Sequence, residues 1–253
     1  MDLHLTQVPA WVSTSFALFL LTVPILLIAN AVKRALDQAN RVDGKMMRRN
    51  IIIFYLIYFM VTGVLSILGT YAINTFPPRI IVGAALPLFL FYFLVVQRKE
   101  WFKAVFKYVS LETLVYIHLF RFVGVFFFTL NSYGVIPDLF AKIGGTGDVL
   151  TAILVIPVIY FIRKKASFAN TLVWIWNTIG LIDILSVLST ALILTREAII
   201  NNQEGVLQIG TFPFSWIPAF APATIIFLHI LVYRKLIKEK SISTNDLIKN
   251  QKT

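Results

Sequence analysis

The sequence predicts an all-α integral membrane protein with seven transmembrane helices. First, 58% of its 253 residues are hydrophobic and only 14% are charged, whereas soluble domains carry about 25% charged residues. Second, continuous apolar runs recur along the whole chain, each long enough for the about 20 helical residues that cross a bilayer. Third, these runs do not alternate in segments of about ten residues, as the strands of a membrane barrel do, so helices are expected to satisfy the backbone hydrogen bonds.

The apolar runs define the predicted spans. They are Trp11–Val32, Asn50–Ile73, Arg79–Gln97, Glu112–Asn131, Thr146–Ile162, Phe168–Leu194 and Ser215–Tyr233. No basic residue precedes the first span, so we expect this span to be retained and not cleaved as a signal peptide. The Gly-rich stretch from Ser132 to Asp148 is expected to be an outer loop that re-enters the bundle or crosses its rim.

A short amphipathic helix is expected after the third span. In a helix, one face would carry the apolar side chains of Trp101, Phe102, Val105, Phe106 and Val109. The charged residues lie largely on the opposite face. We therefore expect this helix to lie in the cytoplasmic interface, with its aromatic side chains among the lipid headgroups.

The distribution of Lys and Arg predicts the orientation in the membrane. The eight ends and connections hold 0, 6, 1, 4, 1, 3, 1 and 6 of these residues in chain order. The even-numbered segments hold 19, the odd-numbered ones hold 3, and the remaining cation is Arg121 inside the fourth span. Because cytoplasmic loops are the positive ones, we expect a multi-pass protein of the cell (cytoplasmic, or inner) membrane with its N-terminus outside and its C-terminus in the cytoplasm. Topology thus accounts for the net charge of +11, so we expect the lipid bilayer as a partner and no nucleic acid.

An internal duplication is predicted within a single membrane domain that covers residues 1–253. The segment FPPRIIVGAALPLFLFYFLVVQRK from Phe76 aligns without gaps with FPFSWIPAFAPATIIFLHILVYRK from Phe212, and eight of the 24 positions are identical. The halves would be 11–99 and 146–235, followed by a cytoplasmic tail at 236–253. The segment 100–132, which contains the fourth span, would link them as a parallel 3+1+3 repeat. The second half carries Asn177, Asp183 and His229 where the first has Ile57, Gly63 and Phe93.

The fourth span carries His118 and Arg121 one helical turn apart near its middle. An arginine at this depth costs about 2.5–3.5 kcal/mol on insertion scales, so it should face protein or water instead of lipid. Asp183 is the preferred counter-ion because it is deep and has no partner on its own helix. Asp148 is the second choice. At the start of the fifth span it would lie in the first helical turn, which Thr146 would cap and where an acid interacts favourably with the helix dipole without any counter-ion.

These residues predict a polar pocket between the fourth, sixth and seventh helices. The expected substrate-binding residues are Arg121, Asp183, His118, Asn177 and His229. Arg121 would offer a charge for a carboxylate or a phosphate, and Asp183 would be its counter-ion or a proton-coupling site. The favoured function is therefore a transporter or binding protein for a small polar or anionic solute. The alternative for the charged pair is a buried ion pair that serves only helix packing.

Two further classes of function stay open. The pair His118 and His229 could ligate a b-type haem as axial ligands, although no cofactor and no metal site is the favoured expectation. The basic cytoplasmic connections could serve as a docking surface of a non-catalytic subunit or sensor. Cysteine is absent, which excludes thiol catalysis and thiolate metal sites. Since no hydrolase, metalloprotease or nucleotide-binding motif occurs either, the sequence favours a protein that is not an enzyme, with its oligomeric state open.

Overall fold

The computed structural model describes residues 4–250, with side chains up to residue 238. Helices cover nearly all of this range, and no β-strand occurs among these residues. In chain order the helices are α1 (Ala10–Gln38), α2 (Gly44–Ile67), η1 (Ile81–Ala85), α3 (Leu86–Leu94), η2 (Val96–Arg98), α4 (Glu100–Tyr108), α5 (Leu111–Ile117), η3 (His118–Gly124), α6 (Val125–Ser132), α7 (Asp138–Arg163), α8 (Ala169–Asn201), η4 (Leu207–Gly210) and α9 (Trp216–Asn250).

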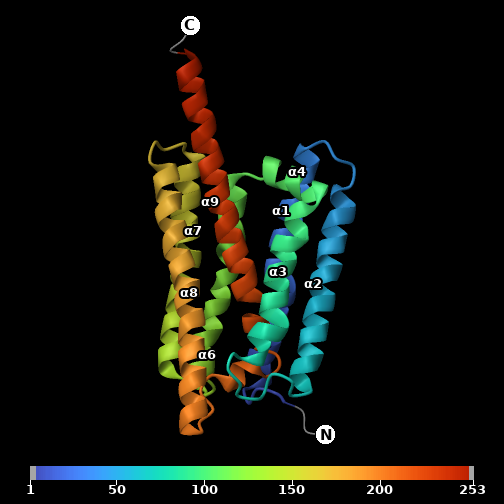
Figure 1. Ribbon diagram of the computed structural model, residues 1–253, viewed down its shortest axis with the longest axis vertical. Helices are drawn as coiled ribbons and strands as arrows, with labels where there is room; N and C mark the ends of the chain where they lie inside the picture. The colour runs from blue at the N-terminus through green and yellow to red at the C-terminus, as the bar shows by residue number, and fades with distance from the viewer. Residues whose placement is uncertain (1–3, 251–253) are drawn as a thin grey trace.

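Seven of these helical segments are long and apolar enough to cross a membrane, which confirms the predicted all-α, multi-pass architecture. The third span joins η1, α3 and η2, and the fourth joins α5, η3 and α6. Helix α9 runs between one group formed by α1, α2 and α3 and another formed by α6, α7 and α8 (Figure 1). It is also the most buried of the seven spans. The two ends of the chain lie at opposite ends of the bundle (Figure 1), as an odd number of spans requires.

The fifth span begins much earlier than predicted, and this corrects the local environment of Asp148. Helix α7 starts at Asp138, directly after Pro137, so Asp148 lies ten residues into the helix and not in its first turn. The glycines at 144, 145 and 147 are thus part of this helix, and only residues 133–137 form a connection. Gly144 and Gly145 lie against the rings of Phe127 and Phe128 on α6, and this close packing offsets the low helix propensity of glycine.

Helix α4 forms where the amphipathic pattern predicted it, but its apolar face packs on the bundle. Phe102, Val105 and Val109 are buried among residues of the other helices, and α4 packs against α1. Trp101 and Phe106 are half-buried. The expectation that the aromatic side chains insert among lipid headgroups is therefore wrong for Phe102, which packs on Phe227 of α9, and it stays a prediction for Trp101 and Phe106.

The duplication stays a prediction. The Phe-Pro pairs that open the two aligned segments, Phe76–Pro77 and Phe212–Pro213, both have cis peptide bonds. The two segments differ after this point, because the first contains the π-helical turn η1 before Pro87, whereas α9 is continuous through Pro222. Helix α9 also continues to Asn250 instead of ending near Tyr233, so most of the predicted tail 236–253 is helical, and residues 251–253 lie outside the described residues.

We call the end of the bundle that carries the connection 39–43, helix α4, the connection 164–168 and the C-terminal part of α9 the basic end. This end carries the even-numbered segments of the Lys and Arg count, with 19 of the 23 cations in the chain. In Figure 1 it is the upper end, from which α9 projects. The opposite end contains the N-terminal residues, the connection before η1 and the segment around η4.

Candidate functional site

The fourth span changes from α-helix to 3₁₀-helix at the residues that the sequence singled out. Ser110 caps the start of α5 by accepting a hydrogen bond from the backbone N–H of Thr113 at 3.1 Å. From His118 to Gly124 the chain forms the 3₁₀ segment η3. Side chains three residues apart are eclipsed in a 3₁₀-helix, so His118 and Arg121 project from the same side. Short 3₁₀ segments inside a longer helix often mark functional positions.

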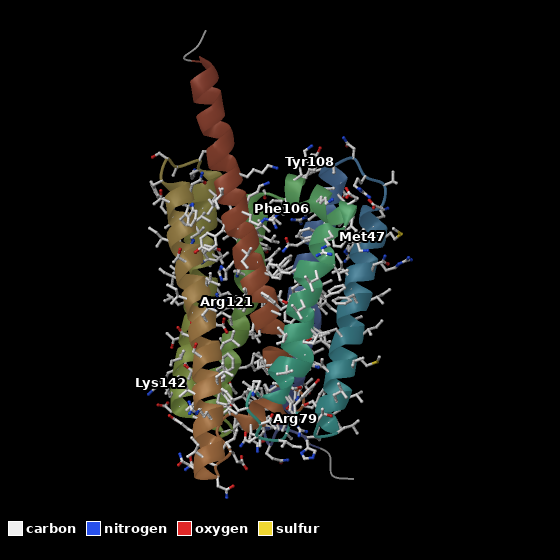
Figure 2. The ribbon with its side chains drawn as sticks, viewed as in Figure 1. Met47, Arg79, Phe106, Tyr108, Arg121 and Lys142 are labelled. Carbon is white, nitrogen blue, oxygen red and sulfur yellow. The ribbon has the colours of Figure 1, made fainter. Side chains whose placement is uncertain are left out.

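Arg121 is fully buried at about mid-height of the bundle (Figure 2) and holds two acids at once. Its Nε donates to Oδ1 of Asp148 on α7 at 2.7 Å, and its Nη2 donates to Oδ2 of Asp183 on α8. Its Nη1 donates to the backbone oxygen of Gly180 at 3.0 Å. The preferred counter-ion, Asp183, and the second choice, Asp148, are thus both partners of the same guanidinium. We call Arg121, Asp148 and Asp183 the ion triad.

The other two predicted polar residues complete one chain of hydrogen bonds with the ion triad. Nη1 of Arg121 lies 3.2 Å from Nε2 of His229 on α9, and arginine can only donate. Nε2 of His229 therefore accepts, which leaves the proton on Nδ1. That nitrogen lies 2.8 Å from Oδ1 of Asn177, and Nδ2 of Asn177 donates to the backbone oxygen of His229 at 3.1 Å. The contacts thus define a neutral His229 with a single tautomer.

His118 is the exception within the site, because neither of its ring nitrogens has a hydrogen-bond partner although the side chain is completely buried. Its ring lies 4.3 Å from that of His229 between centroids, and the edge of Trp176 packs on it at 5.1 Å. A buried polar group without a partner costs about 1–3 kcal/mol. The structure therefore holds an imidazole with two free nitrogens directly beside the hydrogen-bonded chain.

Two glycines, which sequence reasoning did not select, make room for the polar side chains. A Cβ on Gly180 would lie 2.7 Å from Cε1 of His229 and 3.1 Å from Nη1 of Arg121. A Cβ on Gly147 would occupy the position of the Asp183 carboxylate. The spacing Asn177, Gly180, Asp183 was a usable signal, because residues three apart lie along one strip of α8. A glycine between two polar residues on such a strip indicates a close neighbour.

The ion triad carries one acid more than base. With both carboxylates ionised, its net charge is −1, and the side chains of Arg121, Asp148 and Asp183 are only 0%, 4% and 12% exposed. An uncompensated charge in a buried, apolar setting is expensive. A single proton on either carboxylate would remove this charge. The arrangement is therefore suited chemically to take up and release a proton, and Asp183 is the more exposed acid.

The contacts of the two histidines do not favour haem ligation by this pair. Both nitrogens of His229 are within hydrogen-bond distance of Arg121 and Asn177, so an axial bond to iron would require the loss of one of these contacts. Among residues 4–250, no group of three or more His, Asp or Glu side chains is arranged to hold a metal ion.

The fold and the site together define a multi-pass helical membrane protein with an ion triad at the centre of four of its spans. The chain belongs to a family that is described as a domain of unknown function (DUF8737), which matches residues 77–237. The matched range contains every residue of the ion triad together with His118, Asn177 and His229, whereas α1 and α2 lie before it. The comparisons with curated proteins and with solved structures found no match.

Proposed function

We propose that this protein is a proton-coupled transporter of a small polar or anionic solute. The observation that carries the proposal is the charge imbalance of the buried ion triad, in which Arg121 meets both Asp148 and Asp183. Ionisable groups inside membrane domains commonly belong to ion pathways or proton relays.

The mechanism follows from what one proton does to the partners of Arg121. When Asp183 is ionised, the guanidinium contacts two carboxylates, the Gly180 carbonyl and His229, and the ion triad has a charge of −1 that repels an anion. Protonation of Asp183 brings the charge of the triad to zero, so a carboxylate or phosphate of the solute can then take the place of Asp183 at Nη2 of Arg121. The solute and the proton bind together in this scheme, and release of one weakens the binding of the other.

The remaining predicted residues take supporting roles in this scheme. Asn177 holds the tautomer of His229, and His229 in turn holds one edge of Arg121. His118, with two free nitrogens, is the group that accepts a hydrogen bond from the solute or passes the proton. The prolines inside α1, α7 and α9 (Pro24, Pro157 and Pro222) supply bending points for opening and closing.

The orientation belongs to the same proposal. The basic end faces the cytoplasm of a cell (inner) membrane and the N-terminal end faces outside, because the basic end holds 19 of the 23 Lys and Arg residues. The predicted 3+1+3 duplication would fit this class of function, since parallel repeats about an axis along the membrane normal are one known build of transporters.

The test uses proteoliposomes that enclose a pH-sensitive dye. A panel of amino acids, mono- and dicarboxylates, phosphate and sugars is added outside, and solute-dependent proton movement is recorded. We expect movement with at least one anionic solute, and its loss in Asp183→Asn and Asp148→Asn. Asp138→Asn is the matched control, because Asp138 is an exposed acid that pairs with Lys142 on the surface of α7.

A second measurement tests the proton without knowledge of the solute. Infrared difference spectra of the purified protein should contain the carbonyl band of a protonated, buried carboxyl at neutral pH. The band should disappear in Asp183→Asn or Asp148→Asn and persist in Asp138→Asn. A wild-type protein without this band would contradict the proposed proton site, even if a solute is transported by another mechanism.

A further inference from the structure

A cavity lies at the group formed by α1, α2 and α3, and no residue of the ion triad lines it. Its volume is about 240 Å³. Helices α1, α2, α3, α4, α5 and α9 all contribute to its lining, which is almost entirely apolar and rich in aromatic side chains, including Phe54, Phe91, Trp101, Phe106 and Phe227. We call it the apolar cavity. Helix α2 packs mainly on α1 and α3 mainly on α9, and across the cavity wall Phe54 of α2 stacks on Phe91 of α3 with ring centroids 5.1 Å apart.

The few polar side chains of the lining are occupied with one another. The hydroxyl groups of Tyr55 and Tyr92 lie 2.9 Å apart, and that of Tyr92 lies 2.9 Å from Oγ1 of Thr224. These three hydroxyl groups are linked in a row on the wall of the cavity. The rest of the wall is therefore hydrocarbon and aromatic carbon. Asn50, at the exposed edge of α2, is the remaining polar residue of the lining.

Arg234 lies beside the part of the apolar cavity nearest the basic end, and Arg98 is close in the chain to a residue of its lining. The guanidinium of Arg234 lies over the ring of Phe106, 4.8 Å from its centroid, and donates to Oε1 of Gln97 at 2.7 Å. Arg98 follows Val96 of the lining and is exposed. Within the part of the chain that the structure describes, neither arginine forms a salt bridge with an acid. Met47 and Phe106, both lining residues, lie close to this end of the bundle (Figure 2).

We propose that the apolar cavity is a binding site for a single-chain anionic amphiphile, whose acyl chain lies against the aromatic wall while its acidic headgroup lies at Arg98 and Arg234. The charge at the rim matches an anion, and the wall matches a chain. The volume of about 240 Å³ exceeds the about 150 Å³ of a cavity that binds benzene and falls below the about 300–1,000 Å³ of drug-sized sites. It therefore suits part of a chain, with the headgroup outside. This inference does not depend on the proposed transport function.

The test uses quenching of tryptophan fluorescence by dibromostearate added to the full-length protein in nanodiscs. Trp101 lines the apolar cavity, so a bound brominated chain should quench it at a low, saturating mole fraction. The Trp101→Phe variant should lose the saturable component and keep the gradual quenching of residues such as Trp174, which is 41% exposed. The methyl ester of dibromostearate is the neutral probe and should bind more weakly.

Three variants separate the chain from the headgroup. Ala31→Leu adds volume inside the apolar cavity and should abolish saturable quenching, and Val105→Phe fills it from α4 if the first variant fails to fold. Arg98→Gln and Arg234→Gln alter exposed side chains and should each weaken binding about fivefold. Quenching that rises in proportion to the probe and is equal in wild type and Ala31→Leu would overturn the site. Equal binding of the acid and its methyl ester would overturn the anionic headgroup.

Discussion

The two groups of helices on either side of α9 differ in how closely their helices pack. The group of α1, α2 and α3 leaves the apolar cavity of about 240 Å³, whereas the space beside Asp148 in the group of α6, α7 and α8 is about 50 Å³. In the second group, Gly144 and Gly145 meet aromatic rings of α6, and Gly147 and Gly180 meet the polar side chains. Small residues let the backbones approach, and ion pairs then hold the helices together.

The first group has no counterpart of the ion triad at the aligned positions. Ile57, which aligns with Asn177, is 51% exposed, and Phe93, which aligns with His229, is only half-buried and packs on Phe227. Gly63, which aligns with Asp183, lies against Trp216. The comparison teaches that large aromatic side chains leave space between the helices even where tyrosine hydroxyls bridge them, whereas glycines beside a shared charged group let the helices approach closely.

The largest expected change in stability follows from the removal of the positive charge of Arg121, which connects the helices of the second group. Arg121→Met leaves two buried carboxylates without a cation, and breaking a buried pair in this way costs about 3–5 kcal/mol. We expect this decrease in the free energy of unfolding, measured by denaturant titration in detergent micelles. Adding Asp148→Asn and Asp183→Asn to Arg121→Met should recover much of the loss, because no unpaired charge remains. A triple variant as unstable as the single one would contradict this explanation.

Adding the same volume to each group should show the difference in packing directly. Ala152 on α7 is completely buried against α8, so Ala152→Leu should cost about 1–3 kcal/mol by overpacking. Ala31 lines the apolar cavity, so Ala31→Leu has space and should leave the free energy of unfolding unchanged or raise it. Thermal melts of both variants in the same detergent would check this. Equal destabilisation would mean that the apolar cavity closes around its lining in solution.

A methyl group added to a glycine should destabilise the protein at a close helix contact of the second group and should not do so in the first group. Gly180→Ala places its Cβ against His229 and Arg121, and we expect a loss of about 1–3 kcal/mol together with lower proton movement. Gly83→Ala is the matched control, because its Cβ would meet only Cε1 of Tyr71 at 3.8 Å. A helical Gly→Ala change without a clash gains about 0.5–1 kcal/mol. A stable, active Gly180→Ala variant would show that η3 and α9 shift easily.

The smallest change in stability should come from an ion pair that lies outside the spans and is exposed, unlike the buried ion triad. Hydrogen bonds from Arg41 lower the pKa of the Asp43 carboxyl below its ordinary value. This contribution to stability is present above the ordinary pKa of an aspartate and is lost as the pH falls through the lowered pKa. Because the pair is exposed, Asp43→Asn should leave the melting temperature almost unchanged near neutral pH. In acid, the melting temperature of the variant should fall slightly less than that of the wild type. A large loss at neutral pH would contradict this.

The sequence located the site by charge and depth, and this reasoning succeeded for Arg121 and Asp183. A cation in an apolar helix requires an anion at the same depth, whatever the rotation of the helices. It named Asp148 as the second choice but placed it wrongly in a first helical turn, because glycines suggested a loop in a stretch that tertiary packing holds as helix α7. It also missed the apolar cavity, which is lined by residues of six helices and follows from no residue pattern within one of them.

By itself, then, the sequence predicted seven helices of membrane-spanning length, which the structure confirms, and a polar centre in the fourth, sixth and seventh of them, to which the structure adds Asp148 of the fifth. Both results follow from terms that act on each segment separately, namely transfer of apolar residues into lipid and the cost of a buried charge. Only the tertiary structure decided that one arginine holds two aspartates, that His118 keeps both nitrogens free and that the other group of helices encloses a cavity. These features depend on helix rotation and on close approach between backbones, which arise when side chains of different helices compete for the same space.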